Sequence, residues 1–277
     1  MSTLPEKYAV MGNPIAHSKS PVIHATFAQQ TGELIQYQAI LVRTQVGEFA
    51  QAVQTFQDNE GKGLNITVPF KQDAWRLVDH CSVRAQQAEA VNTIWFDAQG
   101  RRMGDNTDGV GLIRDLKNNQ GFDFKGKRIL ILGAGGAVRG ILAPLLEMNP
   151  VQCVIANRTV SKAQTLAIAF KEHGKLSACS YATLSGQLFD LIINGTSASL
   201  QGELPPLPQG ILASGGWCYD MVYGHNPTSF IQWAFSEGAQ HAIDGLGMLV
   251  EQAAEAFFLW RKIRPDTATV IQQLRKK

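Results

Sequence analysis

The sequence lacks the features that mark secreted, membrane or nucleic-acid-binding proteins. Its 277 residues carry a formal net charge of only +2, and the longest basic block is the terminal Arg275-Lys276-Lys277. No stretch approaches the roughly 18 uncharged apolar residues that a membrane span requires, and the first seven residues lack the apolar core of a secretory signal. We therefore expect a cytoplasmic protein that binds neither nucleic acid nor a membrane.

Cysteine is scarce as well. The chain contains Cys81, Cys153, Cys179 and Cys218, and no two of them form a Cys-x-x-Cys pair. Neither a zinc site nor a disulfide framework fits residues scattered in this way. We expect reduced cysteines that pack in the interior, and no bound metal.

What the sequence does contain is an ordinary globular composition in which short apolar runs alternate with helical patterns. Hydrophobic residues make up 45% of the chain and charged residues 17%, and the length suggests two domains. The alternation predicts an α/β fold with helices covering parallel sheets. The expected strands span residues 8–11, 37–42, 63–67, 91–96, 128–132, 152–156 and 189–193; the expected helices span residues 21–31, 46–59 and 70–80, with a long amphipathic helix following Gly245.

A glycine-rich turn follows the strand expected at residues 128–132. Glycines let the backbone approach a pyrophosphate, and the helix that follows offers free N–H donors and about half a positive charge. The turn therefore predicts a Rossmann-type dinucleotide site, although a glycine-rich connection without a ligand is the alternative. The third glycine of the usual pattern is replaced by Val138, which should hold the helix slightly further from its strand. The expected cofactor-binding residues are Gly133, Ala134, Gly135, Gly136 and Ala137.

The next turn along predicts which dinucleotide is bound. NAD-binding units carry an acidic residue about 20 positions after the glycine turn, where it accepts the ribose 2′-hydroxyl. Here the chain reads Asn157-Arg158-Thr159, with Lys162 one turn later. A cation such as Arg158 suits a 2′-phosphate, so we predict NADP. The plainer alternative is that Thr159 caps a helix and Arg158 is solvated.

Four polar clusters stand at predicted strand ends or helix starts, where α/β sheets bind ligands. Each has a plainer explanation: Ser20 caps a helix, Lys71 is a solvated surface lysine, Asn92 is an edge-strand amide, and Asp108 is an N-cap. Against this, the serines and free N–H groups of the first cluster suit a carboxylate. The clusters are Ser18-Lys19-Ser20-Pro21, Asn65-Ile66-Thr67-Val68-Pro69-Phe70-Lys71, Val91-Asn92-Thr93 and Asp105-Asn106-Thr107-Asp108-Gly109.

Taken together, these motifs closely resemble shikimate dehydrogenases, in order and over nearly the whole chain. The resemblance implies an enzyme that reversibly reduces 3-dehydroshikimate to shikimate with NADPH, in aromatic amino-acid biosynthesis. It also implies an N-terminal substrate-binding α/β domain, residues 1–108 completed by residues 245–277, and a Rossmann-type NADP-binding domain, residues 109–244. The segments that carry it are residues 12–21, 65–71, 106–109, 157–159 and 245–249.

Carried over position by position, the resemblance implies a role for each site residue. Ser18, Ser20 and Tyr223 would hold the substrate carboxylate. The remaining substrate-binding residues would be Asn65, Thr67, Lys71, Asn92, Asp108 and Gln252. The adenosine phosphate would contact Asn157, Arg158, Thr159, Val160, Ser161 and Lys162, and Met221 and Gly245 would line the nicotinamide pocket.

Two positions depart from the expected pattern, and both concern cofactor packing rather than chemistry. Gly195 stands where alanine is common, and Val138 replaces a smaller residue. We expect these changes to affect cofactor affinity more than activity.

Lys71 and Asp108 are the predicted catalytic residues. A lysine is a poor base near neutrality unless its surroundings assist it. We therefore hypothesise that the two groups titrate as one coupled pair, with the ammonium donating to the developing alkoxide and the carboxylate orienting both lysine and substrate. This hypothesis requires that the two side chains, far apart in sequence, lie together.

Two alternatives stay open on the sequence alone. One is a quinate/shikimate dehydrogenase that prefers NAD, against which Arg158 argues. The other is a non-catalytic NADP-binding sensor, which would have no use for Lys71 and Asp108 together. We expect a small-molecule substrate as the partner and a monomer or homodimer as the assembly.

Overall fold

The computed structural model describes residues 4–276 and divides into two compact units. The first unit comprises Met1–Gly111 and Val250–Lys277, and the second comprises Leu112–Leu249. The chain thus crosses between units a few residues after the positions expected from the sequence. Residues 1–3 and 277 lie outside the described part, so the start of the segment judged to lack a secretory signal and the end of the terminal basic block are not described.

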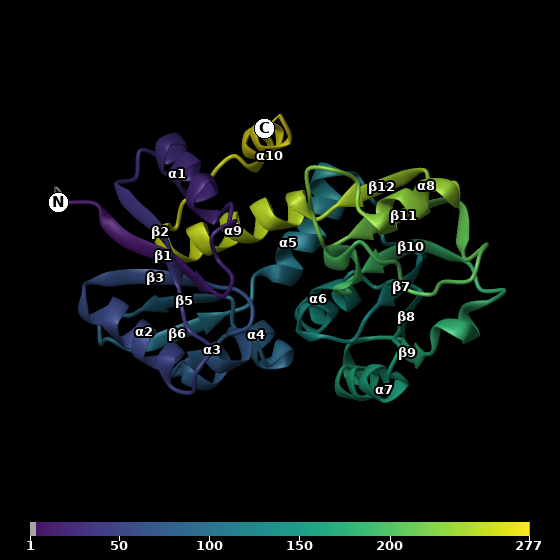
Figure 1. Cartoon of the computed structure of the whole chain (residues 1–277), viewed down its shortest axis with the longest axis horizontal. Coiled ribbons are helices and arrows are strands. Elements are labelled where there is room, and N and C mark those ends of the chain that lie inside the picture. Colours follow the sequence, from purple (N-terminus) through teal and green to yellow (C-terminus); the bar gives the residue numbers. More distant parts are fainter. Residues whose placement is uncertain (1–3, 277) are drawn as a thin grey trace. The chain divides into compact units, whose positions relative to one another are not determined.

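The first unit is built on a six-stranded mixed sheet (Figure 1) with the strand order β2-β1-β3-β5-β6-β4. Strand β5 is antiparallel to both β3 and β6, whereas the other pairs are parallel. The ends of β3 and β6 therefore share one sheet edge with the start of β5. The strands are β1 Glu6–Gly12, β2 Ile35–Leu41, β3 Gly61–Ile66, β4 His80–Cys81, β5 Thr93–Phe96 and β6 Arg102–Asp105.

Helices cover both faces of this sheet. On one face α2 presents Phe49, Val53 and Phe56, which recur at helical spacing and pack with Leu64 and Ile66 of β3 in a buried cluster. The opposite face carries an aromatic group from α1, β2 and α9. The helices of the unit are α1 Ser20–Thr31, α2 Glu48–Asp58, α3 Lys71–Leu77, α4 Val83–Ala88 and α10 Thr267–Arg275, and it shares α5 Asp108–Arg114 and α9 Leu246–Arg261 with the second unit.

The second unit is built on a wholly parallel sheet with the order β12-β11-β10-β7-β8-β9. This is the doubly wound Rossmann order, in which the strand sequence reverses between β7 and β10 and leaves a crevice for ligands at the carboxyl ends. The strands are β7 Arg128–Leu132, β8 Gln152–Ala156, β9 Leu176–Cys179, β10 Phe189–Asn194, β11 Leu212–Asp220 and β12 His241–Asp244.

Alternation along β7 explains how this sheet is buried on both faces. Ile129 and Ile131 belong to the apolar cluster that contains α6 and α7, whereas Leu130 and Leu132 belong to the cluster that contains α8. The helical elements are η1 Asp115–Asn119, α6 Gly136–Glu147, α7 Val160–Ala169, η2 Lys171–His173, η3 Tyr181–Leu184, η4 Ala198–Gln201 and α8 Ser229–Ser236.

The predicted fold class, α/β with two sheets and a Rossmann-type second domain, is confirmed. Several local expectations are wrong. The helix expected over residues 70–80 ends at Leu77, because Val78 is extended and the chain enters β4. The first sheet is mixed rather than parallel, and β6 and α4 were not anticipated. Ser20 is the first residue of α1 rather than its cap, a position that Lys19 takes.

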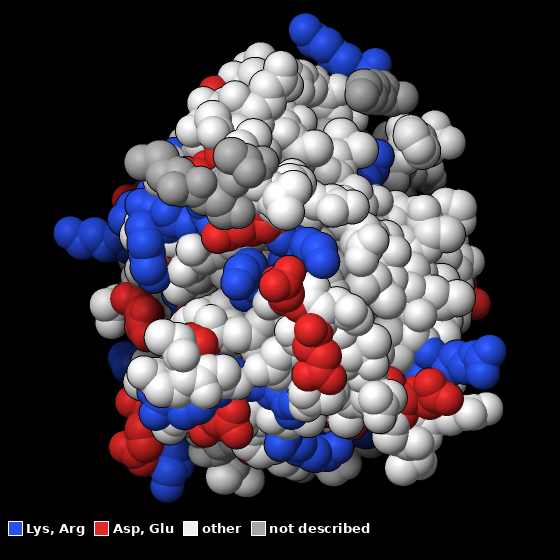
Figure 2. All heavy atoms as spheres, turned by 90° about the vertical axis from the view of Figure 1, so that its left-hand side faces the viewer, with Lys and Arg blue, Asp and Glu red and all other residues white. Residues whose placement is uncertain are grey.

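The formal net charge of the chain is +2. Acidic and basic side chains are interspersed on the face drawn in Figure 2. Among residues 4–276, no helix is both long and apolar enough to cross a membrane. All four cysteines are free; Cys153 and Cys218 are buried, as expected, whereas Cys81 and Cys179 are only partly buried.

Candidate active site

Lys71 and Asp108 meet at the end of the sheet where β3 and β6 both terminate. Lys71 begins α3 shortly after β3 ends, and Asp108 begins α5 shortly after β6 ends. The lysine Nζ lies 2.7 Å from the Asp108 Oδ2, with side-chain exposures of 27% and 10%. The expected proximity of amine and carboxylate is therefore confirmed. Asp108 Oδ2 accepts from Lys71 and Oδ1 accepts from Asn92, so both carboxylate oxygens face the site.

Asn92 completes the surroundings of the Asp108 carboxylate. Its Nδ2 donates to Asp108 Oδ1 at 2.8 Å, and its Oδ1 accepts from the Thr107 backbone N–H at 2.9 Å. A backbone N–H can only donate and an ionised carboxylate can only accept, so the orientation of this amide is determined. Gln252 Oε1 lies 3.3 Å from the same Nδ2. The edge-strand explanation of Asn92 is wrong, because Asn92 directly precedes β5, an interior strand, and its backbone bonds to Ile66 and Asp105 on either side.

Four further predicted substrate residues of the first unit lie on or next to α1 and β3. Ser20 is buried, and its backbone N–H lies 3.3 Å from the Ser18 hydroxyl oxygen. Asn65 is buried on β3, and Thr67 follows the strand rather than belonging to it. A Cβ on Gly12 would lie 2.3 Å from the Thr67 methyl carbon, so the close approach of β1 to this threonine requires glycine.

Some residues that hold the site together were not predicted from the sequence. Arg84 of α4 makes a bidentate pair with Asp105, both N···O distances being 2.7 Å. This pair anchors the end of β6 just before Asp108. Tyr37 and Thr93 also contact the site, through Asn65. Thr93 lies beside Asn92 in the Val91-Asn92-Thr93 cluster, but no sequence motif includes Tyr37 or Arg84.

In the second unit, the glycine turn lies between β7 and α6. Gly133 has a φ of +102°, and a Cβ there would lie 3.2 Å from the Gly195 carbonyl carbon and oxygen. Gly135 is the N-cap of α6, and no side chain caps the helix. Added Cβ atoms at Gly135 and Gly136 would meet nothing within 4 Å. An exposed helix start with uncapped N–H groups and open space is suited to a pyrophosphate.

Val138 and Gly195, the two positions that depart from the expected pattern, pack against each other. A Cβ on Gly195 would lie 2.5 Å from the Val138 Cγ2. The valine side chain therefore fills space that the missing methyl of Gly195 leaves free. The expectation that Val138 alone should displace the helix took no account of this match, and the two positions are better described as one packing pair.

The segment after β8 carries the predicted 2′-phosphate residues. Arg158, Thr159, Ser161 and Lys162 are exposed, and Val160 is half-buried. Asn157 Nδ2 donates to the Thr159 carbonyl at 2.8 Å. Thr159 is the N-cap of α7, as the plainer alternative expects, although its side chain makes no capping bond.

Met221 and Gly245, the predicted nicotinamide-pocket residues, also lie together. A Cβ on Gly245 would lie 2.3 Å from the Met221 carbonyl oxygen. The loop after β11 is tied down by Asp220, whose carboxylate accepts from the hydroxyls of Ser199 and Thr228 at 2.7 and 2.6 Å. Burial raises the pKa of Asp220, and these hydrogen bonds oppose that shift.

Tyr223 lies on this same loop of the second unit, in contrast to Ser18 and Ser20, which belong to the first. The side chain is half-buried, and burial raises the pKa of its hydroxyl.

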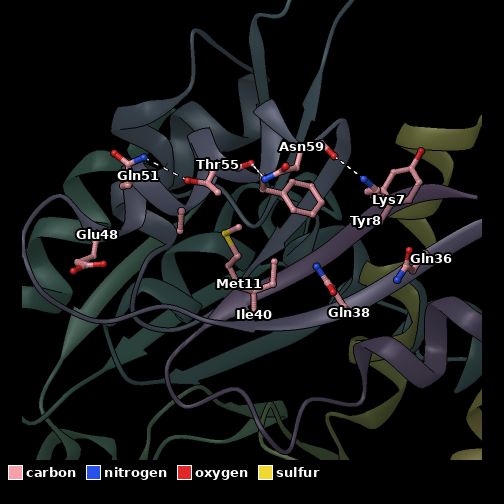
Figure 3. Close-up of a pocket in the computed structure, with 12 residues that line it drawn as sticks. Lys7, Tyr8, Met11, Gln36, Gln38, Ile40, Glu48, Gln51, Thr55 and Asn59 are labelled. Carbon is pink, nitrogen blue, oxygen red and sulfur yellow. Dashed lines mark hydrogen bonds between the residues drawn. The ribbon is translucent and has the colours of Figure 1, made fainter.

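A separate cavity of about 620 Å³ lies in the first unit beside β1, β2 and α2. Figure 3 shows Gln36 and Gln38 of β2 and Gln51 of α2 among its lining residues. None of the predicted site residues lines it. Its Lys7 amine donates to the Asn59 carbonyl rather than to a carboxylate, so it offers no acid and base in contact. The chemistry of the chain is better sought at Lys71 and Asp108.

A parallel sheet of Rossmann order with a glycine turn in the second unit, together with an amine–carboxylate pair in the first unit, is typical of a nucleotide-dependent α/β dehydrogenase. Family models match most of the chain. They describe the shikimate dehydrogenase substrate binding domain at residues 10–94, shikimate / quinate 5-dehydrogenase at residues 115–201, and the shikimate 5′-dehydrogenase C-terminal domain at residues 245–275.

Full-length relatives agree with these matches. The shikimate dehydrogenase (NADP(+)) of Nitrosococcus oceani is 57% identical over 274 residues, which cover 99% of this chain and 96% of the relative. A crystal structure of shikimate 5-dehydrogenase from Thermus thermophilus, in complex with NADP(H) and shikimate, is 31% identical with a TM-score of 0.85, covering 98% of this chain and 99% of that one. The chain therefore belongs to the shikimate dehydrogenase family and is an oxidoreductase, which confirms the resemblance drawn from its motifs.

Proposed function

We propose that the chain catalyses the reversible, NADP-dependent reduction of 3-dehydroshikimate to shikimate, a step of aromatic amino-acid biosynthesis. The observation that carries this proposal is the Lys71–Asp108 pair, with Nζ and Oδ2 separated by 2.7 Å, in a chain whose curated relatives are shikimate dehydrogenases. The first unit would bind the substrate, and the second unit would bind NADP.

The substrate is held by polar side chains of the first unit. The hydroxyls of Ser18 and Ser20 would bind the carboxylate, with Tyr223 of the second unit as a further donor. Around the ring, Lys71 and Asp108 would meet the reacting oxygen and a neighbouring hydroxyl. Asn65, Thr67, Asn92 and Gln252 would complete the ring contacts.

The reaction needs a hydride and a proton. When bound, NADPH supplies the hydride that the carbonyl carbon receives. The Lys71 ammonium donates a hydrogen bond to the carbonyl oxygen and passes one proton to it as the carbon–oxygen double bond becomes single. Asp108 holds the amine in place and accepts a hydrogen bond from the neighbouring ring hydroxyl. In the reverse direction Lys71 accepts the hydroxyl proton; such a group contributes about 10²–10⁴ in rate.

The cofactor residues of the second unit suit NADP. The uncapped start of α6, with open space at Gly135 and Gly136, would accept the pyrophosphate. Exposed Arg158 and Lys162 would pair with the 2′-phosphate, a group that NAD lacks. Met221 and Gly245 would line the nicotinamide site.

The test is a two-by-two assay of the purified chain, with shikimate or quinate as substrate and NADP or NAD as cofactor. We expect the largest kcat/KM for shikimate with NADP. Greater activity with quinate and NAD would instead support a quinate/shikimate dehydrogenase. NADP binding without turnover of either substrate would support a non-catalytic sensor and overturn the proposal.

A further inference from the structure

A continuous hydrogen-bond chain crosses the sheet of the first unit and ends on Asp108. Its first link is the Tyr37 hydroxyl, which donates to Asn65 Oδ1 at 2.7 Å. Asn65 Nδ2 lies 3.3 Å from the Thr93 hydroxyl oxygen, and that hydroxyl lies 3.0 Å from Asn92 Oδ1. Asn92 Nδ2 then donates to Asp108 Oδ1 at 2.8 Å. The strands β2, β3 and β5 therefore each contribute a member.

The orientations of the two amides in this series of hydrogen bonds, and with them the direction of the Tyr37 donor, are determined. Asn92 must point its NH₂ at Asp108, because the Thr107 N–H occupies its oxygen. Asn65 must point its NH₂ away from Tyr37, because that NH₂ also lies 3.4 Å from the Asn92 carbonyl, which can only accept. Tyr37 is therefore a donor to Asn65. All the donors point toward the carboxylate, and an aligned chain of this kind strengthens each of its bonds.

Tyr37 is held so that its hydroxyl faces the site. Its ring stacks on His24 of α1, with centroids 4.2 Å apart and planes 6° from parallel. Burial raises the pKa of the Tyr37 hydroxyl well above its usual value, and the neighbouring side chain of Ser20 lowers that pKa by less. Ser20 thus lies at one end of the chain, and the Lys71–Asp108 pair lies at the other.

We propose that Tyr37 and Thr93 are positioning residues that couple the carboxylate-binding end of the substrate site, at Ser20, to the reactive end, at Asp108. This inference rests on the proposed function. Neither residue touches the reacting atoms; each acts by fixing the amides of Asn65 and Asn92. A substrate that fits Ser20 would therefore meet an Asp108 already oriented toward Lys71 and the ring.

Steady-state kinetics of Tyr37→Phe test the proposal. We expect the KM for shikimate to rise about three- to tenfold, the range that one hydrogen bond supplies, with an unchanged KM for NADP. Tyr8→Phe is the matched control, because Tyr8 lies on the adjacent strand β1 and bonds to Glu6 outside the chain. Equal changes in the two variants, or a shikimate KM within twofold of wild type in Tyr37→Phe, would overturn the assignment.

Substitution of Thr93 interrupts the same series of hydrogen bonds at a second position. Thr93→Val removes the hydroxyl while retaining the shape, so we expect kcat as well as shikimate binding to fall, about three- to tenfold. Thr93→Ser restores the hydroxyl and should recover both. In the double variant Tyr37→Phe/Thr93→Val the losses should be less than multiplicative, because one chain is broken twice. Multiplicative losses, or no rescue by serine, would contradict a shared chain.

A spectroscopic readout separates this inference from the proposed function. In ligand-free protein, Tyr37→Phe should shift the side-chain amide ¹H–¹⁵N signals of both Asn65 and Asn92, whereas Tyr8→Phe should leave them in place. If the wild-type protein did not turn over shikimate, the proposed function would be refuted. The spectra would still test the series of hydrogen bonds from Tyr37 to Asp108. Shifts confined to Asn65 would show that Tyr37 is not coupled to Asn92 and would overturn the inference.

Discussion

The two units prepare for their ligands by different means. The first unit surrounds Lys71 with buried side chains, such as Asn92 and Asp108, whose hydrogen bonds determine one another. The second unit offers an uncapped helix start at Gly135 and exposed cations such as Arg158. Hydroxyl groups of a ligand demand directional partners, whereas a phosphate is satisfied by any well-placed N–H or cation.

This difference teaches where each unit is sensitive to substitution. A buried polar network is costly when one member is removed, because the remaining groups lose their partners away from water. A glycine turn is insensitive to most distant changes, but added atoms at close approaches distort it. We therefore expect the first unit to respond chiefly to deleted side-chain groups and the second to added carbon atoms or lost charge.

The largest effect is expected from Lys71→Ala in the first unit. Removing the proton donor should lower kcat by about 10²–10⁴ while the KM for shikimate moves little. Steady-state assays with shikimate and NADP measure both constants. Lys62→Ala is the control. It removes an exposed lysine of β3, the strand that precedes Lys71, and should behave as wild type. Near-normal turnover of Lys71→Ala would refute the catalytic role.

Arg158→Ala should have the next largest effect and concerns the second unit alone. A hydrogen bond to a charged group contributes about 1.5–3 kcal/mol, so NADP should bind roughly tenfold to a hundredfold more weakly. The KM for NAD should change much less, because NAD lacks the 2′-phosphate. Lys125→Ala removes another exposed cation of this unit and controls for net charge. Equal losses for NADP and NAD would remove the assignment of Arg158.

The structural features that the sequence predicted are those that depend on residues close together along the chain. The Rossmann unit was predictable because β7 runs straight into its glycine turn, and Lys71 and Asp108 were predictable because each starts a helix next to a polar motif. Their meeting required β3 and β6 to end at one edge, which follows only when β5 runs antiparallel between them. Family resemblance anticipated that geometry, whereas periodicity predicted a parallel sheet.

The features that the sequence did not predict are contacts between residues on different elements. No local sequence pattern indicates which residues of two such elements lie side by side. Tyr37 reaches Asn65 because both flank β1, paired with Tyr8 and Val10 respectively. The fit between Val138 and Gly195 likewise joins α6 to the loop after β10. The sequence marks Val138 and Gly195 as separate departures and does not mark Tyr37, and only the fold brings each of these residues to its partner.

Gly195→Ala sharpens the comparison within the second unit. The new Cβ would lie 2.5 Å from Val138 Cγ2, and overpacking of this kind costs about 1–3 kcal/mol. Urea unfolding should show this loss in the free energy of unfolding. In the double variant Val138→Ala/Gly195→Ala the clash disappears, so most of the loss should be recovered. Additive losses in the double variant would show that the two positions do not form a packing pair.

The smallest effect at neutral pH is expected from His24→Phe in the first unit. His24 is fully buried, and neither ring nitrogen has a hydrogen-bond partner within the usual distance among residues 4–276. Burial lowers its pKa to about 3, and the nearby side chain of Asn65 opposes that shift. Between pH 6.5 and 3 the unfolded chain therefore binds a proton that the folded chain excludes, so this histidine makes stability fall as the pH falls.

Phenylalanine keeps a flat ring against Tyr37 and cannot be protonated. The drop in unfolding free energy from pH 7.5 to pH 5 should therefore shrink by about 2 kcal/mol in His24→Phe, measured by urea unfolding at both pH values. Replacing the exposed His225 with glutamine should leave that drop unchanged. An undiminished drop in His24→Phe would mean that His24 is protonated in the folded chain, and a charged imidazole there would be incompatible with an unpartnered, fully buried stack on Tyr37.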